Sequence, residues 1–124
     1  MNIDRFRQGE SILNKVTKSD GKSVIDGLKS ISPELGEFIV EFAYGDVISR
    51  TGLTLKQREL STIAMLGAMN CCAPQLKVHI HGCINVGCTK NEIIETLLQI
   101  CVYAGFPAAI NAMNCAKEIF EMEK

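Results

Sequence analysis

The sequence contains no tryptophan, few aromatic residues and no marked excess of charge of either sign. Of its 124 residues, 6% are aromatic and 22% are charged, and the formal net charge is −1. This balance predicts no basic surface of the kind that binds nucleic acid or an anionic membrane. No apolar run approaches the roughly 20 residues of a membrane-spanning helix, and the polar N-terminus MNIDRFRQGE lacks the apolar centre of a signal peptide. We therefore expect a cytoplasmic protein with no nucleic-acid or membrane partner.

Strand signals are also scarce, whereas helix signals recur along the chain. Ser32, which precedes a proline, is typical of a helix start. Two capping boxes, Thr54 with Gln57 and Thr89 with Glu92, predict two further starts. Apolar residues at helical spacing follow these signals. We expect about six helices, over residues 3–16, 33–47, 54–70, 73–86, 90–103 and from 107 onward, with the polar segment TKSDGKS as a loop.

The length and the regularity of these signals predict one all-α, single-domain helical bundle over residues 1–124. A chain of this size can form one core but has little length to spare. No repeat, low-complexity tract or second domain is visible in the sequence. These signals are silent on assembly, although small helical subunits often complete their cores by association. Tyr103, at the end of a predicted helix, is expected to pack there with its hydroxyl bonded.

Six cysteines occur in a chain with no export signal, which favours free thiols over a disulfide framework. Cys101 and Cys115 lie in apolar runs, where cysteine commonly behaves as a small core residue. The other four cysteines and both histidines lie within the segment CCAPQLKVHIHGCINVGC, which begins at Cys71 and ends at Cys88. This segment is the main candidate for chemistry.

A helix that begins near Pro74 would place Cys72, Gln75, His79 and Cys83 near one face. The positive end of the helix dipole would favour a thiolate at Cys72, and His79 could supply or accept a proton. His81 would point roughly 200° away from His79, toward solvent or an interface. Two structural interpretations stay open: Cys72 as an inert core thiol, and His79 as a histidine bonded to the backbone.

The same segment has side chains suitable for zinc, but its spacing does not predict a metal site. Zinc ligands in the common small sites are paired as C-x2–4-C and H-x3–5-H. His79 and His81 diverge on a helix and cannot share one ion, and His79 with Cys83 supplies two ligands only. We therefore expect no metal.

Two segments resemble those of a known family. YGDVISRTGLTLKQREL is similar to the stretch that precedes the core helices of carboxymuconolactone decarboxylases. HIHGCINVGCTKNEIIETLLQICVYAGFPAAINA is similar to their H-x-x-G-x-x-N-x-G…E-I-x-E-x-x-x-Q…Y-A-G-x-P-A block. The resemblance covers about residues 30 to 120. It implies an all-helical, alkylhydroperoxidase-D-like subunit that assembles into trimers or hexamers.

One branch of this superfamily, the alkylhydroperoxidase-D-type proteins, uses a C-x-x-C-x-x-x-H motif. Cys72 matches its first cysteine and His79 its histidine, whereas Gln75 stands where the resolving cysteine belongs. Glu59 lies near the position of the acid that this branch carries on the preceding helix. A disulfide of Cys72 with adjacent Cys71 would be strained. A resolving role for Cys88 or for a thiol of a neighbouring subunit stays open.

The decarboxylase branch usually shows E-L-x-L-H-x-R-G-A, where this chain reads QLKVHIHGC. His79 is kept, while Gln75 replaces the acid and His81 replaces the arginine. The resemblance implies decarboxylation without a cofactor, because the carbanion left by CO2 loss delocalises into an unsaturated lactone. His79 would deliver the proton, and Arg50 or Arg58 would anchor the substrate.

Three hypotheses follow. The first is a carboxymuconolactone decarboxylase-like lyase that acts on a small carboxylated lactone or related acid, with Gln75 and His81 as further substrate contacts. The second is a thiol-dependent peroxidase or disulfide reductase that uses Cys72, His79 and Glu59. The third is a non-catalytic member of the fold that binds a small molecule.

Overall fold

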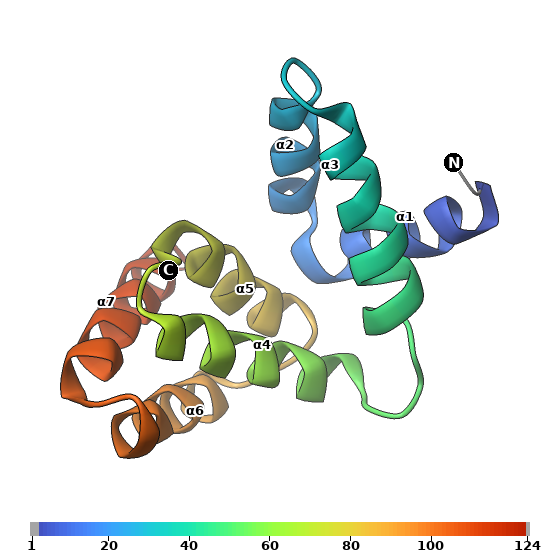
Figure 1. Ribbon diagram of the computed structural model, residues 1–124. Coiled ribbons are helices and arrows are strands. Elements are labelled where there is room, and N and C mark those ends of the chain that lie inside the picture. Colours follow the sequence, from blue (N-terminus) through green and yellow to red (C-terminus); the bar gives the residue numbers. More distant parts are fainter. Residues whose placement is uncertain (1–2, 124) are drawn as a thin grey trace. The chain divides into compact units, whose positions relative to one another are not determined.

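The computed structural model describes residues 3–123, and these residues form helices and connecting turns without a strand (Figure 1). The elements are α1 (Ile3–Thr17), α2 (Ser19–Leu28), α3 (Pro33–Phe38), the π-helix η1 (Ile39–Ile48), α4 (Leu55–Met69), α5 (Ala73–Asn85), α6 (Lys90–Tyr103) and α7 (Phe106–Met122). The all-α prediction is therefore confirmed. Every helix in this range is too short or too polar to cross a membrane.

The chain divides into two compact units, one that ends at Leu55 and one that begins at Lys56. The first contains α1, α2, α3 and η1, and the second contains α4 to α7. The organisation of the whole chain as one domain stays a prediction.

In the first unit, α1 packs closely against η1. Gly9 of α1 makes this contact possible, because a Cβ atom there would lie 1.8 Å from the carbonyl oxygen of Val40. Gly45 of η1 allows the same close approach from the other helix, since a Cβ atom there would lie 2.8 Å from the carbonyl oxygen of Arg5. Val16 and Val40 are buried at 0% and 2% exposure. Two glycines thus bring two backbones together, and the apolar side chains beside them form the core of this unit.

The predicted loop TKSDGKS is wrong, because α2 begins at Ser19 within it. Lys18 has a positive φ of 51° and separates α1 from α2. Gly21 is buried, and a Cβ atom at this position would lie 2.1 Å from the hydroxyl oxygen of Thr17. The glycine that suggested a loop therefore serves close packing of α2 against the end of α1.

The helix predicted over residues 33–47 begins where expected, at Pro33, and the Leu35 N–H donates to the Ser32 side chain at 3.3 Å. From Ile39 onward, however, the chain is a π-helix, and it ends with the Ser49 N–H bonded to the Tyr44 carbonyl, five residues earlier. Apolar spacing indicates a buried helical face but does not distinguish the two kinds of helix.

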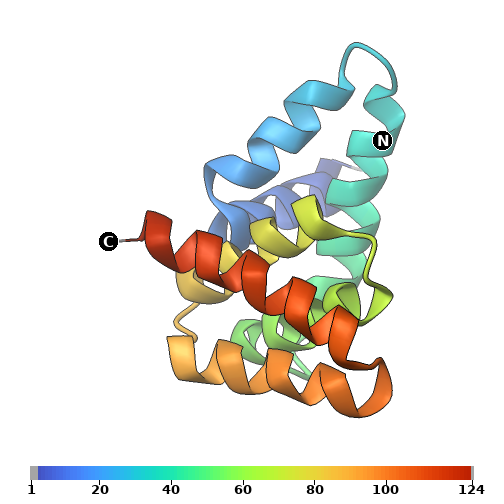
Figure 2. The same ribbon diagram turned by 90° about the vertical axis from the view of Figure 1, so that its left-hand side faces the viewer.

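The second unit is a four-helix arrangement around one apolar core. α6 and α7 are antiparallel neighbours joined by a turn at Gly105, which has a φ of +95° (Figure 2). The Thr89–Glu92 capping box is confirmed at the start of α6, while the Thr54–Gln57 box stays a prediction. The core residues with 0% exposure are Ile63, Ile80, Cys83, Ile93 and Leu97.

Two side chains of α6 are more exposed than the sequence predicts. Tyr103 is 89% exposed, so the prediction that it packs is wrong. Tyr103 is the last residue of α6. The buried face of α6, which includes Leu97 and Ile100, lies on another side of this helix. Cys115 is buried as expected, while Cys101 is only partly buried.

Candidate functional site

The second unit contains a buried acid–imidazole pair formed by Glu59 and His79. The Nδ1 atom of His79 lies 2.7 Å from Oε1 of Glu59. The Glu59 side chain is 1% exposed and that of His79 is 19% exposed. A carboxylate this deeply buried requires a hydrogen-bonding or charged partner, and His79 supplies it.

Helix geometry explains how the two side chains meet. Glu59 lies on the buried face of α4, one turn before Ile63. His79 lies on α5 beside the buried residues Ile80 and Cys83. Glu59 therefore reaches across from α4 to the imidazole within the interior of the unit. Glu59 thus lies on the helix before α5 and contacts His79, while its role as the acid stays a prediction.

The pairing determines which imidazole nitrogen is available for chemistry. An ionised carboxylate only accepts hydrogen bonds, so Nδ1 of His79 is the donor when Glu59 is ionised. Nε2 is then the nitrogen that can exchange a proton with a bound molecule. An imidazole held in this way is oriented for general acid–base catalysis.

Cys72 does not join this pair. It precedes α5 as its N-cap, with a φ of −124° and a ψ of 40°, so its side chain does not follow the helical face that contains His79. Its Sγ atom lies 3.6 Å from that of Cys71. The hydrogen bond with the Cys71 thiol, followed by burial, raises the pKa of Cys72. The expectation that the helix dipole favours a thiolate there is therefore not met.

The remaining candidates on α5 differ in their surroundings. Gln75 is exposed, one turn before His79. Cys83 is fully buried one turn after it, and burial together with the neighbouring Cys88 thiol raises the pKa of Cys83. His81 points elsewhere, as its sequence offset predicts, and its Nε2 atom lies 2.6 Å from Oε1 of Glu123, the residue that follows α7.

The two arginines lie in different units. Arg58 is partly buried on α4, directly before Glu59, whereas Arg50 is exposed after η1. Arg50 lines a polar pocket of about 510 Å³ in the first unit, together with Asp46 and Ser49. The anchoring role of either arginine stays a prediction.

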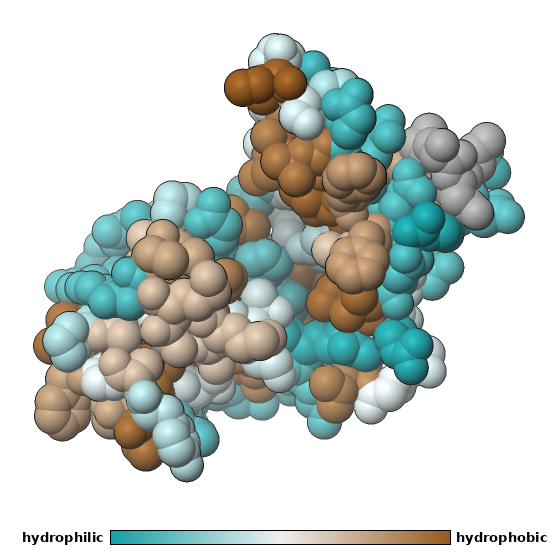
Figure 3. Space-filling model, viewed as in Figure 1, coloured by the Kyte–Doolittle hydropathy of each residue, from teal (hydrophilic) through white to brown (hydrophobic). Residues whose placement is uncertain are grey.

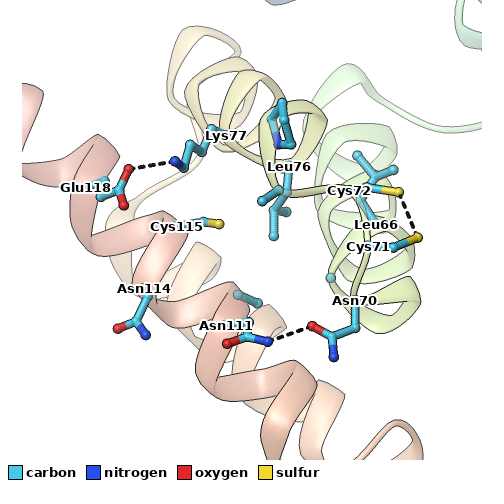
Figure 4. A pocket seen from close by; sticks show the side chains of 14 residues that line it. Leu66, Asn70, Cys71, Cys72, Leu76, Lys77, Asn111, Asn114, Cys115 and Glu118 are labelled. Atoms are coloured by element: carbon cyan, nitrogen blue, oxygen red, sulfur yellow. Dashed lines mark hydrogen bonds and ion pairs between the residues drawn. The ribbon is translucent and has the colours of Figure 1, made fainter.

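A pocket of about 410 Å³, which the sequence did not predict, lies between the start of α5, the end of α4 and α7 (Figure 4). An amide hydrogen bond of 2.8 Å from Asn111 to Asn70 and an ion pair of 2.7 Å between Lys77 and Glu118 lie along it. No local signal predicts this pocket, because it depends on how α7 packs against α4 and α5.

The contact between Cys83 and Cys88 was also missed, although a local signal exists for it. The Cys88 N–H donates to the Cys83 carbonyl at 2.9 Å, and Gly87 between them has a φ of +97°. These features define a Schellman helix end, in which the residues at these two positions usually touch. A glycine followed by cysteine after a helix could have predicted the contact.

The sequence is similar to known proteins over most of its length. The sequence model of the carboxymuconolactone decarboxylase family matches residues 33–118. A 4-carboxymuconolactone decarboxylase of Acinetobacter baylyi is 37% identical over 119 residues, which cover 94% of this chain and 87% of the relative. An uncharacterized 15.0 kDa protein of Paracoccus denitrificans is 30% identical over 97 residues, 77% of this chain and 72% of that protein.

A further relative also bears the name of a decarboxylase. A nitrosuccinic acid decarboxylase of Metarhizium robertsii is 42% identical over 77 residues, which cover 62% of this chain and 53% of the relative. The family match spans most of the chain, and so does the similarity to the Acinetobacter enzyme. This chain therefore belongs to the carboxymuconolactone decarboxylase family.

Proposed function

We propose that the protein is a carboxy-lyase that removes CO2 from a small carboxylated lactone or a related acid without a cofactor. Two relatives named as decarboxylases, of 4-carboxymuconolactone and of nitrosuccinic acid, support a decarboxylase-like function. The observation that carries the proposal is the 2.7 Å contact between His79 and buried Glu59. It gives the protein an oriented proton donor.

The proposed reaction has two steps. The substrate carboxylate leaves as CO2, and the electron pair of the broken C–C bond delocalises into the unsaturated system as a dienolate. The imidazolium of His79 then transfers its Nε2 proton to the carbon, which completes the product. Glu59, which accepts from Nδ1, stabilises the imidazolium and keeps the ring in place. A proton from solvent restores His79.

The substrate also needs groups that hold its carboxylate and developing charge. Arg58, one residue before Glu59, is the proposed anchor from the same unit. Gln75, exposed one turn before His79, is proposed to donate a hydrogen bond where the resembled branch has an acid. The earlier candidates Arg50 and His81 stay predictions, and the pairing of His81 with Glu123 makes it the weaker of these two.

The thiol-dependent alternative would use the same Glu59–His79 pair together with Cys72. A peroxidatic cysteine needs its thiolate form. The hydrogen bond with Cys71 raises the pKa of Cys72 and so opposes that form. We therefore rank the lyase first, and the alternative becomes one outcome of the test, as does a member of the fold that binds but does not react.

The test is a decarboxylation assay with 4-carboxymuconolactone and related carboxylated lactones, following loss of the substrate. Replacement of His79 by Ala or Gln should abolish turnover, and His79→Gln retains a side-chain donor that can satisfy buried Glu59. Glu118→Gln is the control and should keep activity, because Glu118 is an exposed carboxylate that pairs with Lys77. Cys72→Ser should also keep it. Loss of activity in Cys72→Ser, with His79→Gln active, would refute the proposed lyase mechanism.

We further propose that the protein works in the cytoplasm as a homo-oligomer, a trimer or a hexamer. The support is a set of large apolar side chains on the surface of the described residues, among them Phe38, Phe42, Val102 and Phe106, each more than half exposed. Exposed apolar surface of this extent is typical of interaction sites.

A further inference from the structure

Cys71 and Cys72 form a pair of adjacent free thiols at the turn between α4 and α5. Their Sγ atoms lie 3.6 Å apart, and the two side chains extend in the same direction (Figure 4). Cys71 is exposed and Cys72 is partly exposed, so both are accessible from solvent. Both residues line the pocket of about 410 Å³, at its edge next to Leu66.

The distance between the two sulfur atoms favours a ligand atom that bonds both of them at a bent angle. With sulfur–ligand bonds of about 2.3 Å, as in zinc thiolate sites, a separation of 3.6 Å corresponds to an angle of about 100°. A linear two-coordinate ion would instead need sulfurs about 4.6 Å apart, by the same bond length. A direct S–S bond would require closure to about 2.05 Å. A pyramidal trivalent atom fits the present geometry without such a change.

We propose that Cys71 and Cys72 are a binding site for trivalent arsenicals that carry one organic substituent, R–As(OH)2. Each thiol replaces one hydroxyl on arsenic, so two As–S bonds form, two As–O bonds break, and the two thiol protons leave in two molecules of water. Arsenic stays trivalent and the sulfurs are neither oxidised nor reduced, so no further reagent takes part.

The pocket beside the thiols can receive the organic substituent. Leu76 points into the pocket, and the thiol of Cys115 lies opposite, across from the dithiol (Figure 4). Its volume of about 410 Å³ exceeds the roughly 150 Å³ of an engineered cavity that takes up benzene. The pocket therefore has room for an aryl substituent on arsenic.

The surroundings favour such a compound over a metal ion. Among the described residues, no group of three or more His, Cys, Asp or Glu side chains gathers to hold a metal. A trivalent arsenical supplies its own third substituent, so it needs only two sulfur ligands from the protein. The raised pKa of Cys72 keeps its thiol protonated, which hinders metal binding by thiolates but suits a condensation that releases water.

This site is separate from the proposed lyase machinery. Neither Glu59 nor His79 lines the pocket at Cys71 and Cys72. The proposal therefore stands or falls independently of decarboxylation, and the experiment needs no activity assay.

The experiment treats the reduced, full-length protein with phenylarsine oxide, which forms the phenyl compound of this class in water. Intact-mass spectrometry should show one phenylarsenic group per chain that survives excess 2-mercaptoethanol and is removed by 2,3-dimercaptopropanol. After trypsin treatment, the adduct should lie on residues 59–77, which contain Cys71 and Cys72, and not on residues 78–90, which contain Cys83 and Cys88.

Variants complete the test. Cys71→Ser and Cys72→Ser should each lower retention after the monothiol wash at least tenfold. Cys101→Ser, which changes a partly buried cysteine away from the pair, should retain the adduct fully. The proposal is wrong if the wild-type protein takes up no adduct, if the adduct lies on residues 78–90, or if both serine variants retain it.

Discussion

His79 Nδ1 and Glu59 Oε1 lie 2.7 Å apart, although the two residues are twenty positions apart in the sequence. The Glu59 side chain is 1% exposed, so water contributes little to its solvation. Removing one partner of a buried pair leaves the other without compensation, which commonly costs about 3–5 kcal/mol. The pair thus contributes both to the stability of the fold and to the proposed proton transfer. A variant that separates the two roles must keep a hydrogen-bonding side chain at the substituted position.

Glu59→Gln is such a variant. The amide keeps the size of the carboxylate and can still bond the imidazole, but it has no negative charge to stabilise the imidazolium. Because it can also donate, it no longer selects the ring form that carries a proton on Nδ1. We expect kcat for decarboxylation to fall about 10²-fold or more, within the range typical of general acid catalysis, while KM changes little.

The control for this prediction is Glu118→Gln. Glu118 is an exposed carboxylate of α7 that pairs with Lys77 and not with His79. Its replacement should leave kcat unchanged, and both variants should unfold cooperatively by circular dichroism. A Glu59→Gln enzyme with wild-type kcat would show that the carboxylate only fills and stabilises the interior.

Local signals predicted much of the fold because the interactions behind them are local. The Thr89 backbone N–H donates to Oε1 of Glu92 at 2.8 Å and the Glu92 N–H donates to the Thr89 hydroxyl at 3.0 Å, as the capping box requires. Ser32 caps α3 with a single bond of this kind, from the Leu35 N–H to its hydroxyl. The segment around Gly21 was misassigned because its burial against Thr17 depends on the packing of two helices, which a turn-forming composition does not reveal.

The candidate site was less predictable than the fold. The resemblance indicated Glu59 and His79, but their contact depends on how α4 packs against α5. Helical spacing placed Cys72 on the face of His79, and this failed because the N-cap residue does not have helical backbone angles. Its observed partner, Cys71, is its sequence neighbour, and adjacent residues do not face one another on a helix.

The close approach of α1 and η1 predicts a large effect from a small substitution. In Gly9→Ala, the added methyl group would lie 1.8 Å from the Val40 carbonyl oxygen and 2.8 Å from its carbon. Both atoms belong to the backbone, so the two helices must move apart. We expect the free energy of unfolding to fall by about 2 kcal/mol or more, as in overpacked interiors, when measured by urea denaturation.

Gly27→Ala is the matched control, because Gly27 also lies within a helix, α2. A Cβ atom there would have no neighbour within 4 Å. Alanine is the better helix former by about 0.5–1 kcal/mol, so this variant should be slightly more stable than the wild type. If Gly9→Ala is as stable as Gly27→Ala, the described α1–η1 contact is wrong.

The apolar surface of the first unit predicts an effect on assembly. Hydrophobic side chains gather over α3 and η1 (Figure 3), where Phe38 is 66% and Phe42 is 61% exposed. These residues lie one turn apart. Replacing both with Glu should lower the molar mass measured by light scattering after gel filtration, whereas Lys15→Glu, on exposed α1 surface, should not change it. A wild-type protein that is monomeric at micromolar concentration would contradict the proposed trimer or hexamer.

Glu92 links the stability of the second unit to pH. The Thr89 backbone N–H that donates to Glu92, together with Lys56, whose Nζ lies 3.4 Å from Oε1, holds the pKa of Glu92 below its ordinary value of 4.5. A carboxyl whose pKa is lower in the folded than in the unfolded state stabilises the fold fully above the unfolded pKa. This contribution is lost as the pH falls through the folded pKa.

We therefore expect Glu92→Gln to be less stable than the wild type at pH 7, and the difference in their urea midpoints to shrink as the pH falls below 4.5 and through the lower pKa of folded Glu92. Comparing the two proteins at each pH cancels the titration of the other carboxyls, including Asp46, whose pKa is lowered by its hydrogen bond with Arg5. Added salt should weaken the Lys56 contribution and leave that of the Thr89 N–H largely intact, because screening acts on exposed charges. A difference between the midpoints that stays constant from pH 7 to pH 3 would show that the carboxylate charge of Glu92 does not stabilise α6.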